Sequence, residues 1–318
     1  MGTKYKILEH EDFKKDFKDR SYYNEGVESL DLSLWEDFRK VVKIFNGNTD
    51  YIWRGQRCYP EQIDISTNNE GWKLISTFDR YYKPGKIKLN EIFNNFKKRL
   101  LDLPDTHNID FTKKYEIWAI GQHYGLPTPL LDWTKNPNTA AYFAFYKKKD
   151  KNQTKDRVVY ALNRVLERYI LKEKDPKTHE LVNRQRKIDF DFDFDMSHFS
   201  PEHRLRLINQ ESAFTRAYKG KDIKSIVQNF WERDSKRKKN YTNSVILTEI
   251  LIPDKFHEDC LTDLKFMNIT HGKLFPDDAG AVDICKIDLN LGNLKESPAN
   301  LSKINYLKWL GREDSNHK

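Results

Sequence analysis

A carboxylate, an indole and a hydroxyl stand side by side at Asp132, Trp133 and Thr134. They follow Pro127 and Pro129, each of which disfavours helical backbone in the residue before it, so the segment should be extended. Polar groups at the end of such a segment can line a ligand pocket. The alternative is a buried corner in which Asp132 caps backbone amides before the next helix. The residues alone leave both interpretations open.

Arg54 ends the apolar run in YIWRGQ and is followed by Gly55. A guanidinium is expensive to bury without an anionic partner, and it pairs with phosphate or carboxylate through two parallel hydrogen bonds. The glycine lets another group approach closely. The two residues therefore indicate either an anion-binding position or a structural salt bridge to a carboxylate such as Asp132.

Gln210 and Glu211 stand directly before a predicted strand, among Arg204, Arg206 and Arg216. A carboxylate at a strand edge can bind a ribose hydroxyl or stabilise positive charge that develops on a sugar. A surface glutamate among arginines is the simpler alternative.

His123 lies at the predicted end of a helix, where a cation interacts favourably with the helix dipole. It is therefore a candidate for a helix cap or for a catalytic group. The sequence has no second histidine at metal-ligand spacing nearby and no GxSxG, P-loop or GxGxxG motif. We predict no metal site.

The 318-residue chain has a formal net charge of +8 and an isoelectric point of about 9.0. Such a charge raises the local concentration of anionic partners, although many basic proteins are merely soluble. The three cysteines have no CxxC spacing, so neither a disulfide framework nor a zinc site is predicted. Because no apolar run resembles a signal peptide or could span a bilayer, we expect a cytoplasmic protein.

Because the sequence has no internal repeat and no Pro/Gly/Ser-rich linker, we predict one elaborated domain over residues 1–318, with a helical part at about 1–48, a core at about 49–290 and a tail at 291–318. Helices are predicted at residues 30–46, 88–103, 113–124, 137–146 and 252–267, with a final helix starting near Pro276. Strands are predicted at residues 50–55, 158–163, 212–218 and 243–252. Asn136 should cap the helix that begins with Pro137, and that helix is apolar on nearly every side, so it should be central.

Two segments have an unusual composition. Residues 188–199, IDFDFDFDMSHF, alternate Asp and Phe at the period of a strand, which favours an edge strand with a buried Phe face over a cation site or an acidic mimic of nucleic acid. Residues 235–240, SKRKKN, predict a solvated loop or a phosphate contact. Tyr81 and Tyr82, near Arg80, are predicted to be core residues, with base stacking as the alternative.

Taken together, these segments resemble the FRG domain family, which is named for a Phe/Tyr-Arg-Gly motif. YIWRGQ has this motif with Trp53 in the aromatic position. AIGQHYGLPTPLLDWTKNPNTAAYFA is similar to the most specific segment of the family and departs from it at Pro129, where arginine is common. Looser similarity continues through residues 206–214 and 252–284.

The order of these segments resembles the layout of ADP-ribosyltransferases. This resemblance implies an α+β fold with a split, mixed or antiparallel sheet and several surrounding helices. It implies NAD as a substrate and no metal. The implied catalytic residues are Glu211, Gln210 and His123. The implied NAD-binding residues are Arg54, Gly55, Gln56, Gln122, Tyr124, Asp132, Trp133, Thr134 and Tyr142.

The same resemblance implies a role for each group. Arg54 binds the pyrophosphate, oriented by Asp132, and Trp133 or Tyr142 stacks on the nicotinamide or adenine ring. Thr134 hydrogen-bonds the ligand. Glu211 stabilises the oxocarbenium-like ribose that remains when nicotinamide leaves, and His123 or Glu211 deprotonates the acceptor.

We therefore expect an NAD-dependent ADP-ribosyltransferase of the bacterial toxin or antiphage-defence type. The positive net charge favours a nucleic acid acceptor, RNA or single-stranded DNA, and a toxin would have a neutralising antitoxin as its partner. Two alternatives use the same pocket: a non-catalytic module that binds a nucleotide or RNA, and an NAD hydrolase.

Overall fold

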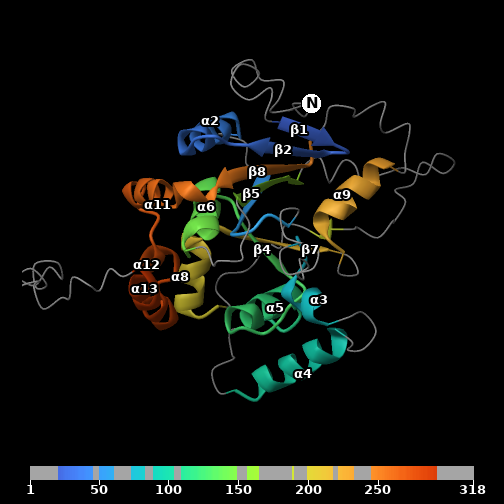
Figure 1. Cartoon of the computed structure of the whole chain (residues 1–318). Helices are drawn as coiled ribbons and strands as arrows, with labels where there is room; N and C mark the ends of the chain where they lie inside the picture. Colours follow the sequence, from blue (N-terminus) through green and yellow to red (C-terminus); the bar gives the residue numbers. More distant parts are fainter. Residues whose placement is uncertain are drawn as a thin grey trace, which may run out of the picture.

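The computed structural model describes residues 21–45, 50–60, 73–82, 89–103, 109–148, 156–164, 188–189, 199–217, 221–232 and 245–291. An eight-stranded sheet runs through this part of the chain (Figure 1). Its strands are β1 Ser21–Asn24, β2 Val27–Asp31, β3 Tyr51–Gln56, β4 Leu131–Thr134, β5 Asp156–Asn163, β6 Ile188–Asp189, β7 Ser212–Ala217 and β8 Leu247–Pro253.

The order of the strands in space is β1-β2-β8-β5-β3-β4-β7-β6. β2 runs parallel to β8, and the other neighbouring strands are antiparallel. The sheet is therefore mixed. Together with its helices it confirms the predicted α+β fold class.

The sheet is weakly joined between β3 and β4. β3 shares six register pairs with β5, and β4 shares four with β7. β3 and β4 themselves are joined only by the pair Trp53–Thr134 among the residues that the structure describes. The two strands therefore diverge at this point, and side chains from both can face a common space.

The helices are α2 Trp35–Phe45, α3 Thr77–Tyr81, α4 Leu89–Leu101, α5 Lys114–His123, α6 Pro137–Phe145, α8 Pro201–Asn209, α9 Ile223–Glu232, α11 His257–Phe266, α12 His271–Leu274 and α13 Asp278–Leu291, with a 3₁₀ turn η7 at Asp254–Phe256. None of the described helices is both long and apolar enough to cross a bilayer.

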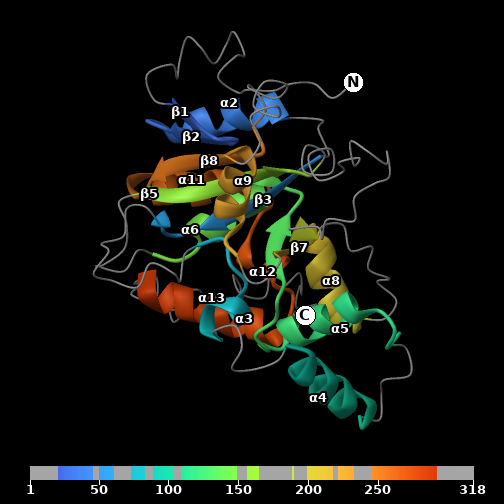
Figure 2. The same ribbon diagram turned by 90° about the vertical axis from the view of Figure 1, so that its right-hand side faces the viewer.

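Helices cover both faces of the sheet (Figures 1 and 2). α2, α6 and α11 pack on one face, where Phe38, Phe145 and Leu264 join one buried cluster. α9 packs on the other face, where Ile223 and Val227 join a second cluster. The central position predicted for the apolar helix α6 is confirmed, because five of its residues, Ala140, Ala141, Tyr142, Ala144 and Phe145, belong to the first cluster.

A third buried cluster lies where α4, α5 and α8 meet, below the sheet in Figure 1. Phe93 of α4 packs its ring against Trp118 of α5, with 5.3 Å between the ring centroids. Leu207 of α8 and Phe214 of β7 belong to the same cluster. This cluster fixes α5 and α8 beside the end of β4.

One prediction at the N-terminal side is wrong, and one structural feature there was missed. The predicted helix over residues 30–46 begins only at Trp35, because Val27–Asp31 forms β2 and pairs in parallel with β8. The hairpin of β1 and β2 was not predicted. Its turn has Glu25 at φ 49° and Gly26 at φ 81°, the left-handed backbone that two-residue hairpins need.

Several local predictions are confirmed. Asn136 caps α6 through bonds from the main-chain nitrogens of Asn138 and Thr139, and Pro137 starts the helix. Ile188–Asp189 pairs with β7 as an edge strand, whereas residues 190–198 and 235–240 lie outside the described part of the chain. The final helix starts at Asp278 rather than at Pro276.

Candidate functional site

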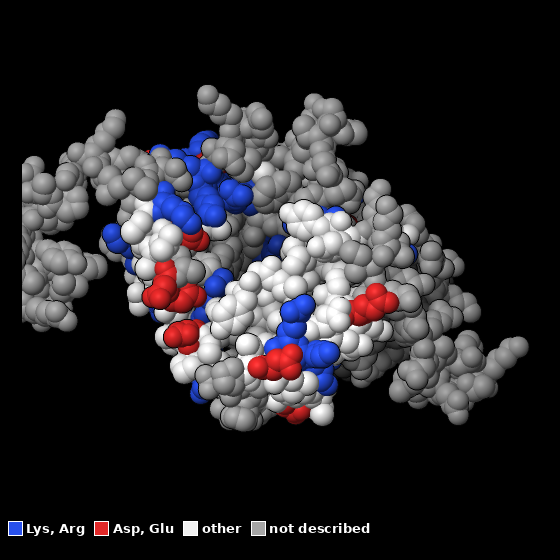
Figure 3. All heavy atoms as spheres, turned by 90° about the horizontal axis from the view of Figure 1, so that it is seen from below, with Lys and Arg blue, Asp and Glu red and all other residues white. Residues whose placement is uncertain are grey.

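A cavity of about 390 Å³ lies where β3 and β4 diverge. Seen from below, the surface has a hollow with Lys and Arg side chains inside it and around it (Figure 3). The cavity is lined by Trp53, Arg54, Gly55, Gln56, Arg57, Arg80, Ala119, Gln122, His123, Asp132, Trp133, Thr134, Phe143, Tyr146, His203, Arg206, Leu207, Gln210, Ser212, Phe214 and Phe275. Nine of the twelve predicted site residues are in this lining.

The cavity is strongly basic. Four arginines line it, Arg54, Arg57, Arg80 and Arg206, whereas Asp132 is the sole carboxylate among the described lining residues. Four positive groups against one negative group leave a formal charge of +3. Guanidinium groups in a partly desolvated cleft attract and orient anions such as phosphate.

Arg54 and Asp132 are held together across the split in the sheet. The Arg54 guanidinium donates from Nη1 to the main-chain oxygen of Asp132 at 2.7 Å. The carboxylate of Asp132 accepts a hydrogen bond from Nε2 of Gln122, and Oε1 of Gln122 accepts one from the hydroxyl of Thr128. This chain of contacts fixes the carboxylate at the cavity wall.

The environment of Asp132 raises the pKa of its carboxyl group. Desolvation by the surrounding protein is the main cause, and the positive charges of Arg54 and Arg206 oppose it. The structural salt bridge considered from the sequence takes a different form, because Arg54 donates a hydrogen bond to the main-chain carbonyl of Asp132. The carboxylate itself faces the cavity.

Two histidines stack at one side of the cavity. The rings of His123 and His203 have centroids 4.0 Å apart at an interplanar angle of 19°. Burial lowers the pKa of His123, and the neighbouring Arg206 lowers it further. Burial, His123 and Arg206 together lower the pKa of His203 to about 3. The surroundings therefore favour the neutral form of both rings.

The turn between α8 and β7 is bound to the start of α6. The Thr134 hydroxyl donates to the carbonyl of Gln210 at 2.6 Å and accepts a bond from the main-chain nitrogen of Asn136 at 3.0 Å. Nδ2 of Asn136 donates to Oε1 of Glu211 at 2.8 Å. Thr134, predicted to bind the ligand, therefore joins three segments of the fold.

Glu211 lies outside the described cavity lining. It adopts a left-handed backbone with φ of 46°, and its exposed carboxylate is held by Asn136. Its neighbour Gln210 does line the cavity, and its Nε2 donates to the carbonyl of Leu274 at 2.8 Å. Of the two groups predicted to be catalytic in this turn, the structure brings only Gln210 to the cavity.

Tyr142 and Tyr124 also lie outside the lining. Tyr142 is buried, and its hydroxyl is 3.2 Å from Nδ1 of His271, so it packs under α12 instead of facing the cavity. Phe143 and Tyr146 are the aromatic residues of this region that line the cavity. Tyr124 is 71% exposed.

Gly55 has a packing role that the sequence shows only in part. A Cβ atom at this position would lie 1.8 Å from the carbonyl oxygen of Ala140 and 2.7 Å from the nitrogen of Ala144. Only a residue without a side chain allows α6 to lie this close to β3. The Arg-Gly pair thus places a guanidinium in the cavity and seats the helix behind it.

Sequence reasoning missed His203 and did not assign Arg206 to the site. His203, Arg206, Leu207 and Gln210 all line the cavity from α8 and its cap. Their spacing of three, four and seven residues marks one face of a helix, so a helical projection would have grouped them. Arg80 carries no comparable signal, because it comes from the separate short helix α3.

Two exposed tyrosines neighbour cavity residues in the sequence. Tyr81 is 71% exposed and follows Arg80, and Tyr124 is equally exposed and follows His123, whose ring it contacts edge-on. The core position predicted for Tyr81 is therefore wrong, since its ring faces solvent. Among the described residues, no group of three or more His, Cys, Asp or Glu side chains could hold a metal ion.

Comparison with known proteins yields one relationship. The model of the FRG domain matches residues 49–153, which include β3, β4 and α6. No curated protein and no solved structure matches the chain. The matched segment contains both Arg54-Gly55 and Asp132-Trp133-Thr134, so residues 49–153 of the chain match the FRG domain family.

Proposed function

We propose that the protein is an NAD-dependent ADP-ribosyltransferase whose acceptor is nucleic acid, with RNA favoured over single-stranded DNA. The observation that carries the proposal is the cavity at the split between β3 and β4, lined by four arginines and a single described carboxylate. NAD has an anionic pyrophosphate between two ring systems, and a cavity of about 390 Å³ is within the range of small-molecule sites.

The arginines and aromatic residues of the lining suit the two parts of NAD. Arg54 and Arg206 face the same cavity from β3 and α8, so they can bind the pyrophosphate from two sides. Phe143, Tyr146 and Phe275 give the cavity an aromatic wall for a nicotinamide or adenine ring. This wall takes the place that the resemblance assigned to Tyr142.

Asp132 is the carboxylate best placed for the chemistry, in place of Glu211. In the proposed reaction the bond between C1′ of the ribose and the nicotinamide nitrogen breaks, and nicotinamide leaves with the electron pair. The ionised carboxylate of Asp132 stabilises the positive charge on the ribose. An acceptor oxygen or nitrogen then bonds to C1′ and transfers its proton to the neutral His123 ring.

The surroundings of the cavity support an anionic acceptor. The exposed rings of Tyr81 and Tyr124 follow cavity residues in the chain, and bases of a single strand can stack on such rings. The whole chain carries a formal charge of +8. Both features favour nucleic acid over a basic protein as the acceptor.

A non-catalytic nucleotide-binding module is the second candidate. It is favoured by the position of Glu211, whose carboxylate is held by Asn136 outside the cavity lining. A binder would use the same arginines for the phosphates. It would not need a carboxylate near the ribose.

The test uses NAD labelled at its adenylate phosphate, incubated with the protein and a bacterial extract. Portions of each sample are then treated with ribonuclease, deoxyribonuclease or protease. We expect macromolecule-bound label that ribonuclease releases. Asp132→Asn should reduce labelling about 100-fold, because it removes a charge that acts in the transition state, whereas the matched Glu211→Gln should change it less than about threefold.

Each other outcome changes a defined part of the proposal. Loss of labelling in Glu211→Gln alone returns the catalytic role to Glu211. Free ADP-ribose without bound label indicates an NAD hydrolase. Intact NAD in every sample, together with binding that Arg54→Ala abolishes, indicates the binding module.

We extend the proposal to a toxin or antiphage-defence role. Induced expression of the wild-type chain in bacteria should then arrest growth, and Asp132→Asn should not. Normal growth with full labelling activity in the extract would refute the toxin role and leave the transferase intact.

A further inference from the structure

A second cavity, of about 420 Å³, shares no described lining residue with the first. It lies on the face of the sheet that α9 covers, and strands β1, β2 and β5 contribute to it. The residues that matter for its chemistry are Tyr22, Asn24, Ser29, Tyr59, Lys224 and Gln228. The function proposed above does not use it.

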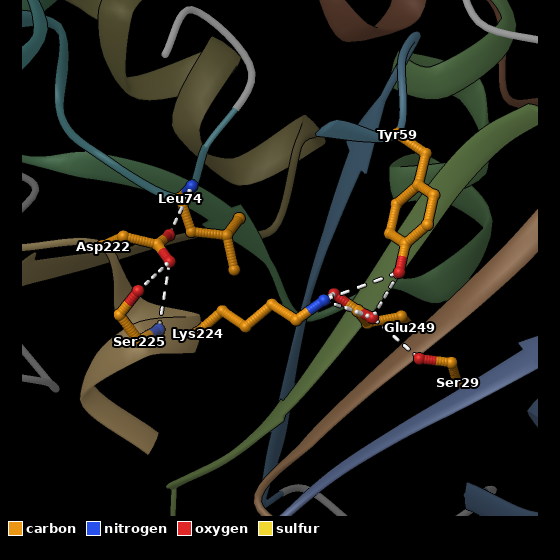
Figure 4. Close-up of polar contacts among 7 residues, drawn as sticks. All are labelled: Ser29, Tyr59, Leu74, Asp222, Lys224, Ser225 and Glu249. Atoms are coloured by element: carbon orange, nitrogen blue, oxygen red, sulfur yellow. Dashed lines mark hydrogen bonds and ion pairs between the residues drawn. The ribbon is translucent and has the colours of Figure 1, made fainter. Parts of the chain in front are cut away.

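A buried ionic cluster borders this cavity through Ser29, Tyr59 and Lys224, and Figure 4 shows its polar contacts. Glu249 of β8 is 0% exposed, and its Oε2 accepts bonds from Ser29 Oγ at 2.8 Å, Tyr59 Oη at 2.9 Å and Lys224 Nζ at 2.9 Å. Lys224 also lies 2.8 Å from Oε1 of Glu249. Three of these four residues line the cavity, so the cluster presents hydroxyl groups and the lysine side chain to it.

Stability alone does not require this cluster. Burying an ion pair has a desolvation penalty, and apolar residues of similar size are often equally stabilising. Leu247 and Leu251, which flank Glu249 on the same face of β8, are apolar, as are Ile226 and Val227 of α9. An ionic cluster among them, open to a cavity through its hydroxyl groups, is typical of a binding site.

The charges of the second cavity balance. Lys224 is compensated by Glu249, and the lining contains one further lysine, Lys73, and one acid, Asp222. Asp222 caps α9 by accepting bonds from the nitrogen of Ser225 at 3.0 Å and from the nitrogen of Leu74 at 2.9 Å. The described lining, counted together with Glu249, is therefore formally neutral, whereas the first cavity, counted together with the Asp277 that pairs with Arg206, has a formal charge of +2.

The groups that remain are aromatic rings, amides and hydroxyls. Tyr22 is 66% exposed on the edge strand β1, so its ring stands at the mouth, and Tyr160 contributes a buried ring from β5. Asn24 and Gln228 provide amides. Rings of this kind stack on a heteroaromatic base, and the amides and hydroxyls suit ribose hydroxyls and base edges.

We propose that the second cavity binds a neutral nucleoside, with its base against the tyrosine rings and its ribose over Ser29 and Tyr59. A phosphate is not expected to strengthen binding, because Glu249 and Asp222 offset the two lysines. The proposal does not depend on the function of the first cavity.

The test is equilibrium dialysis of the full chain against labelled adenosine and labelled uridine, with AMP and ribose as competitors. We expect saturable binding of at least one nucleoside at one site per chain. Tyr22→Ala and Gln228→Ala should each weaken it by at least about tenfold, and Tyr22→Phe should retain it. Arg54→Ala, which changes the first cavity, should leave it unchanged. Both changed side chains lie at the surface of the second cavity, and an unchanged thermal midpoint checks that each variant is folded.

Three results would overturn the proposal. The first is that neither nucleoside binds saturably at concentrations up to about 5 mM. The second is that binding survives both Tyr22→Ala and Gln228→Ala. The third is that Arg54→Ala abolishes binding. Competition by ribose as strong as that by the nucleoside would remove the role of the base. Tighter binding of AMP in the Arg54→Ala variant would remove the requirement for a neutral ligand.

Discussion

Gly55→Ala should destabilise the protein by about 3 kcal/mol, the upper end of the range for overpacking a tight contact. The added Cβ would lie 1.8 Å from the carbonyl oxygen of Ala140, about 1.6 Å inside the 3.4 Å at which ordinary contact begins. The opposing atoms belong to the backbone of α6, so no side chain can rotate away. The helix itself has to move, and its capping residue Asn136 is bonded to Thr134 and Glu211.

Two other glycines provide matched controls, because a Gly→Ala change restricts the unfolded chain similarly at each position. Gly272 lies in α12, and a Cβ added there would have no atom of the described residues within 4 Å, so Gly272→Ala should be neutral or stabilising by up to about 1 kcal/mol. Gly125 has equal space but a φ of +87°, so Gly125→Ala should be destabilising by about 1 kcal/mol through backbone strain alone.

The assay is urea denaturation of the wild type and the three variants, followed by circular dichroism. We expect the order Gly272→Ala, wild type, Gly125→Ala, Gly55→Ala from most to least stable, with the thermal midpoint of Gly55→Ala lower by about 6 °C. A Gly55→Ala variant within about 0.5 kcal/mol of the wild type would refute the close seating of α6 on β3.

Three further predictions concern charged or titratable groups. The pKa of His203 is about 3 in the folded chain and about 6.5 in the unfolded chain, so the free energy of unfolding falls as the pH drops through this window. His203→Leu should reduce the loss of stability between about pH 7 and pH 5 by about 2 kcal/mol in urea titrations. The same dependence of stability on pH in the variant and the wild type would contradict the lowered pKa of His203. Folding raises the pKa of Asp132, so ionisation of this carboxyl group opposes folding once the pH exceeds its pKa in the unfolded chain. Asp132→Asn should therefore be more stable than the wild type at neutral pH, and this gain in stability should vanish in acid. Arg157 is 1% exposed and donates hydrogen bonds to Asp254 and to the carbonyl oxygens of Ala144 and Lys147. Arg157→Met should lower the free energy of unfolding by about 3 kcal/mol. If the variant and the wild type were equally stable in chemical denaturation, the ion pair would be dispensable.

Local signals predicted the elements around the first cavity. Asn136 and Pro137 marked the start of α6, and the apolar run before Arg54 marked β3. Caps and short apolar runs act over a few residues, so the chain reveals them without its tertiary structure. Strand β2 was not predicted, because its longest pairing is with β8, which is more than 200 residues away in the sequence.

The sequence predicted those residues of the candidate site that lie in segments with a recognisable motif. Arg54, Gln122 and Asp132 reach the cavity as expected, whereas Arg80 and His203 arrive from segments that only the folded chain brings together. Glu211 shows a different limit. Its left-handed backbone is unusual for a glutamate, and this conformation accompanies a carboxylate that is bonded outside the cavity lining.

The weak joint in the sheet has a consequence for how the family segment should be handled. Residues 49–153 include β3 and β4, but β3 pairs along six residues with β5, and β4 along four with β7, and both partners lie outside that segment. A fragment cut at 49–153 would therefore expose two unpaired strand edges, the kind of surface that templates aggregation. The segment that matches the FRG model thus lacks the partners of its own strands, and truncation studies need boundaries that include β8 as well as β5 and β7.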